Sequence, residues 1–171
     1  MKEWLVGLLG ATSLSFAAAA LAGSASAPVK SGDLPPADRS AKPGAKLWTP
    51  VSYGGKSGAM QLFFVDLESV RKSGSALELS ALMINEHPSR GGVDRVEERV
   101  RFLCESRRAI SLEQRYYRGA VQLHLITPEP VAEIFPDGSA WRIMIDSVCT
   151  DEIPEERTAD PKNYADAFFN G

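Results

Sequence analysis

The two cysteines of this 171-residue chain, Cys104 and Cys149, are the residues that most directly predict a chemical bond. An even number of cysteines in an oxidising compartment indicates a disulfide. Closing a loop of this length would contribute about 4 kcal/mol to the free energy of unfolding. A metal pair or a catalytic thiol would need histidine or acidic partners at ligand spacing, and neither cysteine has them. We therefore predict a Cys104–Cys149 disulfide.

Histidine and serine side chains add little to this chemistry. The chain has two histidines; His87 falls in a loop rich in proline and glycine, and His124 on the polar side of an expected strand. A metal site needs three or four convergent ligands. The serines considered as nucleophiles, Ser69, Ser111 and Ser139, lack a G-x-S-x-G context. We expect no metal and no cofactor.

The carboxylates do not form a catalytic pair. Glu97 and Glu98 are adjacent, and neighbouring residues of a strand face opposite sides of a sheet. Asp66 follows an apolar run and is expected to cap a turn with its side chain. The sequence thus predicts a protein that is not an enzyme.

Arginines form the one charged feature that could bind a partner. Strand alternation places Arg95, Arg99 and Arg101 on one face, with further arginines and glutamates nearby in the sequence. Two interpretations stay open: weak cross-strand ion pairs, or a face that binds a protein partner. Nucleic acid is excluded as a partner because the chain is acidic overall, with a net charge of −3.

The elements that must position these residues begin after a leader. Lys2 precedes an uncharged, Leu- and Ala-rich run over 4–22, and small residues fill 23–27. This order is typical of a secretory signal peptide, assigned to 1–27. Cleavage could follow either Ala27 or Ala25. The alternative to a cleaved signal peptide is an uncleaved membrane anchor. Ser24 stands where a lipoprotein would need cysteine.

Composition divides the exported part into three. Residues 28–46 are rich in proline, serine and glycine and predict a flexible linker. Residues 47–149 form the folded unit, with no apolar run long enough to span a membrane. Residues 150–171 predict a solvated acidic tail, whose last apolar cluster could dock as a short amphipathic turn. That cluster comprises Tyr164, Ala167, Phe168 and Phe169.

Within the folded unit the apolar pattern mostly has period two, which indicates strands. We expect a meander of about six antiparallel strands, near 47–53, 60–65, 77–86, 96–104, 109–117 and 121–125. A tight helical turn is expected at 66–70. The period then changes to that of one helical face, after an N-cap at Ser139. Trp141, Met144, Ile145, Val148 and Cys149 make up that face.

The strand containing Cys104 shows which face is buried. Val96, Val100 and Phe102 alternate toward the same side as Cys104, with Glu98 as the exception. Cys149 ends the apolar stripe of the helix. The predicted disulfide would therefore pin the C-terminal helix across the buried face of an α+β domain.

This arrangement resembles the surface-adhesin protein E family of small bacterial envelope domains. The likeness covers residues 47–149. Its carriers are Trp48 with the strand after it, Phe64-Val65-Asp66 with Ser69-Val70, 99–104 with Arg107-Arg108, Tyr117 with Gly119, and Pro136, Ser139 and the helix ending Val148-Cys149.

The resemblance implies a sheet of about six antiparallel strands, a disulfide-held C-terminal helix, and an exported chain that could form a homodimer. It also implies a non-catalytic, adhesin-like binding protein in the periplasm or at the cell surface. Its partner would be a protein of the host matrix or of the envelope. A periplasmic structural or assembly factor is the alternative. Ser24 and the acidic segment 150–171 depart from the pattern and leave surface display open.

Overall fold

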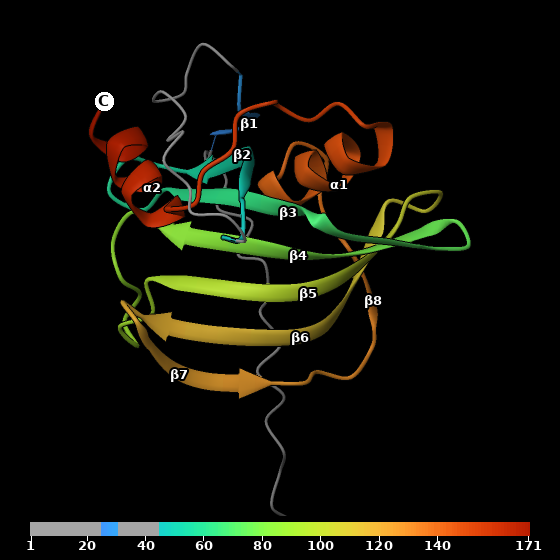
Figure 1. Ribbon diagram of the computed structural model, residues 1–171, viewed down its shortest axis with the longest axis horizontal. Coiled ribbons are helices and arrows are strands. Elements are labelled where there is room, and N and C mark those ends of the chain that lie inside the picture. Colours follow the sequence, from blue (N-terminus) through green and yellow to red (C-terminus); the bar gives the residue numbers. More distant parts are fainter. Residues whose placement is uncertain (1–24, 31–44) are drawn as a thin grey trace, which may run out of the picture.

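The computed structural model describes residues 25–30 and 45–171, which form one large antiparallel sheet flanked by two helices (Figure 1). The predicted signal peptide, apart from its last three residues, and most of the predicted linker lie outside the described residues. Among those described, no helix combines the length and apolar character needed to cross a membrane.

The sheet runs β1-β2-β3-β4-β5-β6-β7, and every neighbouring pair is antiparallel. A further strand, β8, pairs with the part of β6 that β7 leaves free. The strands are β1 (Ala25–Pro28), β2 (Thr49–Gly55), β3 (Gln61–Ser73), β4 (Ala76–Asn85), β5 (Arg95–Leu103), β6 (Arg108–Arg118), β7 (Val121–Ile126) and β8 (Ala132–Ile134).

The antiparallel meander is confirmed, but the sheet has eight strands rather than about six. The two additional strands are β1, with four residues, and β8, with three. Neither strand is long enough to show a periodic apolar pattern, so the sequence did not predict them. Both form by pairing with strands distant in sequence. Val29, next to β1, donates its N–H to the Val51 carbonyl at 3.2 Å and is buried, so this residue of the predicted linker packs against the folded unit.

The expected helical turn at 66–70 is wrong, because β3 continues through it. The register against β4 shifts between Asp66 and Arg71, as in a β-bulge. Asp66 Oδ1 accepts hydrogen bonds from the backbone N–H groups of Glu68 at 3.0 Å and Ser69 at 3.2 Å. The capping role predicted for Asp66 is thus confirmed, although it caps a bulge in a strand.

The first helix, α1 (Ala140–Thr150), packs on one face of the sheet. Its predicted N-cap is confirmed, since the Ser139 hydroxyl accepts the Arg142 N–H at 3.2 Å. Met144 and Ile145 are fully buried against the sheet. They share a core with the side chains of the facing strands, among them Phe63, Val65, Leu79, Val100 and Phe102.

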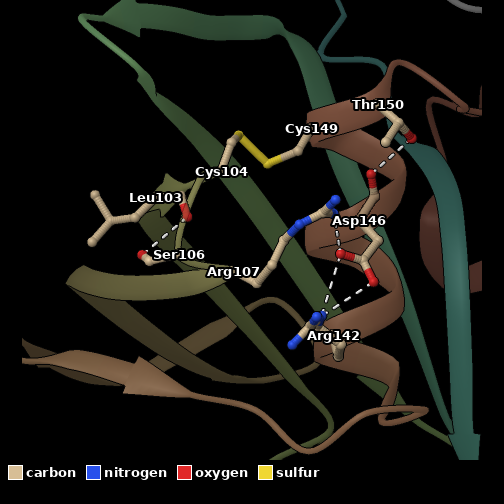
Figure 2. Close-up of a disulfide and its surroundings, with 8 residues drawn as sticks. All are labelled: Leu103, Cys104, Ser106, Arg107, Arg142, Asp146, Cys149 and Thr150. Carbon is tan, nitrogen blue, oxygen red and sulfur yellow. Dashed lines mark hydrogen bonds and ion pairs between the residues drawn. A yellow bond between two sulfur atoms is a disulfide. The ribbon is translucent and has the colours of Figure 1, made fainter.

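The predicted disulfide joins the end of α1 to the turn between β5 and β6 (Figure 2). The Cα atoms of Cys104 and Cys149 lie 5.5 Å apart. Beside the bridge, Arg107 of the same turn pairs with Asp146 of α1, and the Arg142 Nε lies 3.1 Å from Asp146 Oδ2. A covalent link and an ionic cluster therefore hold the same corner of the domain.

The second helix, α2 (Pro161–Asn170), packs on the opposite face, so the segment 150–171 is not the solvated tail that was expected. Tyr164 is buried and meets Phe64 edge to face, with ring centroids 5.8 Å apart. Trp48 and Thr158 exchange two backbone hydrogen bonds of 2.9 Å that fasten the approach to α2. The apolar cluster docks on the sheet as predicted, but it does so as a helix of ten residues rather than as a short turn. The acidic residues of the segment made its apolar face hard to recognise in the sequence.

Candidate functional site

The predicted arginine face exists on β5, opposite the α1 side, but its three arginines make different contacts. Arg101 pairs with Glu78 of β4, with Nε 2.8 Å from Glu78 Oε1. The Arg95 guanidinium lies over the Tyr117 ring, 4.3 Å from its centroid. Arg99 is exposed. Cross-strand pairing thus accounts for Arg101, and partner binding by this face stays a prediction.

The other side of the sheet carries a cavity of about 590 Å³ between strands β3–β6 and the segment that leads from β8 into α1. Its wall is mostly apolar. The principal lining side chains are Phe63, Met83, Val96, Val100, Phe135 and Trp141, with Glu98, Ser111, Gln114, Tyr116 and Glu133 as polar groups. The volume is within the range of small-molecule sites.

Glu98 lies in this cavity because strand alternation turns it to the α1 side together with Val96 and Val100. Gln114 Nε2, on the neighbouring strand β6, donates to Glu98 Oε1 at 3.4 Å. The Tyr116 hydroxyl donates in turn to Gln114 Oε1 at 2.6 Å. Together, these contacts form a short polar chain within an otherwise apolar site.

The electrostatics of the cavity centre on this carboxyl. Burial raises the pKa of Glu98, opposed by hydrogen bonding from Ser111 and Gln114, and Glu133 adds a smaller upward effect. Burial also raises the pKa of Tyr116, and the nearby Glu98 carboxylate adds to that rise. Perturbed titration in a concave site is a mark of functional residues.

Three aromatic rings form one side of the cavity. Phe135 and Trp141 are stacked, with centroids 5.2 Å apart and an interplanar angle of 17°. Phe63 meets Trp141 edge to face at 5.8 Å. Because all three rings line the cavity, they offer an apolar surface and a π face to a ligand.

A second surface lies at the far edge of the sheet, where the strand order ends at β7. Val121 is 63% exposed, and Leu125 and Ile126 are also exposed. Val131, just before β8, and Ile134, at the end of β8, are exposed as well, with Ile134 at 66%. We call this set of five residues the β7 edge patch.

The remaining candidates do not converge. His87 is exposed in the connection between β4 and β5, and His124 is exposed on β7. Ser69 holds the β3 bulge through its hydroxyl, which accepts the Ser80 N–H at 2.8 Å. Of the predicted candidates, Ser111 and Ser139 line the cavity together with Glu98.

Sequence reasoning missed the cavity, although one signal pointed to it. Glu98 interrupts the apolar face of β5, and a charged residue on a buried face needs a partner or a role. The position of β8, which brings Glu133 and Phe135 to the site, had no such signal.

A scan against models of known protein families, a search of curated proteins and a search of solved structures each found no match.

Proposed function

We propose that this chain is an exported, non-catalytic binding module that recognises another protein, of the envelope or of a host matrix, through β7. The observation that carries the proposal is the exposed apolar edge strand Val121–Ile126. The resemblance to surface-adhesin protein E domains points the same way. The Cys104–Cys149 disulfide is compatible with an oxidising compartment outside the cytoplasm.

The edge offers backbone and side chains together. An edge strand leaves a row of N–H and C=O groups available for pairing, and natural proteins usually protect such edges with charge, proline or a covering segment. β7 contains neither proline nor lysine, and three of its six residues are large, exposed and apolar. An extended segment of a partner could pair with β7 and cover Val121 and Leu125, a common mode of peptide recognition.

The test introduces charge at the β7 edge patch. V121K/L125K should lose capture of a protein ligand from matrix or outer-envelope extracts, and S57K/S75K, which adds the same charge at exposed turns, should keep it. With the captured protein purified, hydrogen exchange should show new protection of β7 amides. Equal capture by both variants, or self-association through β7 in sedimentation, would contradict the proposal.

Localisation separates the adhesin-like role from a periplasmic one. An assembly factor would use the same edge for an envelope component inside the outer boundary of the cell. Protease treatment of intact cells should degrade a surface-displayed chain and spare a periplasmic one. The β7 result is expected in either location.

A further inference from the structure

We propose that the cavity on the α1 side is a binding site for a small organic ammonium ion, with the ammonium at Glu98 and the apolar body against Phe135 and Trp141. This site is separate from the β7 edge patch, and its ligand is a free amine rather than a protein. The proposal therefore stands or falls independently of protein recognition by β7.

The charges around the cavity favour a cation. Among the described residues that line it, three are acidic, namely Glu98, Glu133 and Asp137, and none is lysine, arginine or histidine. Asp137 already pairs with the Arg142 Nη1 at 3.1 Å. Glu98 and Glu133 have no ion pair with any described lysine or arginine. An anionic ligand would meet uncompensated repulsion here.

Glu98 has no evident role in the fold. Its neighbours Gln114 and Ser111 are neutral, and an apolar residue at its position would continue the pattern of Val96 and Val100. A carboxyl held in apolar surroundings is costly when ionised unless a cation accompanies it. An incoming ammonium would supply that missing charge, together with a charge-assisted hydrogen bond.

The aromatic wall complements the carboxyl. Trp141 and the stacked Phe135 line the same cavity as Glu98, so they offer an apolar surface to the body of a ligand whose ammonium lies at the carboxyl. A volume of about 590 Å³ accommodates a ligand well beyond the size of a simple alkylamine. A hydrated metal ion would make no use of these rings.

The charged and titratable groups facing Glu98 define the pH dependence. They are Tyr116 on β6, Glu133 on β8 and Asp137 just before α1. The residues of β4 that line the cavity have only apolar side chains. Burial raises the pKa of Glu98 in the free protein, and a bound cation lowers it again. Binding should therefore release protons at mildly acidic pH, and affinity should fall as the pH falls.

The experiment compares two probes of nearly equal shape by calorimetry and by NMR titration. 2-Phenylethylamine is an ammonium at neutral pH, and 2-phenylethanol is its neutral counterpart. For ligands of this size we expect dissociation constants on the order of 1–10 mM. The amine should bind at least about tenfold more tightly than the alcohol, since hydrogen bonds to charged groups contribute that much.

Matched variants locate the ammonium. Glu98→Gln keeps the shape and the hydrogen bonding of the site and should lose the preference for the amine. Glu133→Gln, at the exposed rim, should change affinity less than about threefold because its charge is screened by water. Melting curves and circular dichroism verify that both variants fold. Trp141→Leu should weaken both probes.

Three results would overturn the proposal. They are equal binding of amine and alcohol, retention of the amine preference in Glu98→Gln, and no chemical-shift change at residues lining the cavity with either probe at saturating concentration. None of them bears on capture of a protein by β7, so failure here is distinguishable from failure of the proposed function.

Discussion

The two sides of this sheet surround a carboxylate with different kinds of partner. On the α2 side, Glu78 faces Arg101 across neighbouring strands, and the pair lies partly in water. On the α1 side, Glu98 faces a cavity lined by aromatic and aliphatic side chains, with neutral Gln114 as its hydrogen-bond donor. The first arrangement is complete within the chain, and the second has no lysine or arginine beside it among the residues that the structure describes.

The same contrast applies to how the helices are attached. α1 is held by a disulfide and by the Arg107–Asp146 pair, whereas α2 is held by packing around Tyr164 and by the backbone pairing of Trp48 with Thr158. The α1 side is thus tied down at one corner and left open at the cavity. This combination suits a ligand site, because a fixed frame limits the rearrangement needed on binding.

The largest effect is expected from breaking the covalent corner. The double variant Cys104→Ser, Cys149→Ser should lose about 4 kcal/mol of unfolding free energy, because the unfolded chain regains the entropy of an open loop. Urea denaturation of oxidised wild type and of the variant measures this. Equal unfolding midpoints would show that core packing and the ionic cluster hold α1 without the disulfide.

On the α2 side, Tyr164→Ala should cost about 3 kcal/mol, through loss of a buried aromatic ring and its contact with Phe64. Tyr164→Phe is the matched control. The buried hydroxyl makes no hydrogen bond within the described residues, so its removal should leave stability unchanged or slightly raised. A large loss in Tyr164→Phe would reveal a polar role for α2.

A smaller effect, with a definite sign, is expected at Glu98. Because burial raises its pKa, the folded protein holds this proton to higher pH than the unfolded chain does. This contribution to stability is full at low pH and is lost as the pH rises above about 4.5, the ordinary glutamate value, through the raised pKa. In Glu98→Gln this decline should be absent. Urea titrations at a series of pH values compare the two, and parallel pH profiles would place Glu98 in water.

The smallest effect is expected on the arginine face. Arg99→Ser with Arg101→Ser should change the unfolding free energy by about 1 kcal/mol or less, because exposed ion pairs contribute little. Protein capture through β7 should be retained. Loss of capture with an unchanged melting temperature would instead show that the protein partner binds the arginine face rather than β7.

The local patterns of the sequence were enough to predict the meander, α1, its Ser139 cap and the disulfide. The strands, α1 and its cap rest on a repeating period, as in Val96, Val100 and Phe102, or on a spacing within one element, whereas the disulfide rests on an even number of cysteines in a chain expected to be exported. The pairing of β1 and β8 depends on strands far along the chain, and the acidic residues around Tyr164 obscured α2. Glu98 on the apolar face of β5 was the one local sign of the cavity, and the rest of its wall could not be predicted because Glu133 and Phe135 reach it only through that long-range pairing.

The bond between Cys104 and Cys149 also closes a ring of main chain that contains β6, β7, β8 and α1. The connection between β7 and β8, around Thr127 and Glu129, is exposed and is a natural point of attack for proteases. A single cut there would open the polypeptide without releasing either fragment, since the two ends stay covalently joined through sulfur. The β7 edge patch and two of the three aromatic residues of the cavity, Phe135 and Trp141, belong to this ring, so the domain would survive a nick as one molecule for as long as its surroundings stay oxidising.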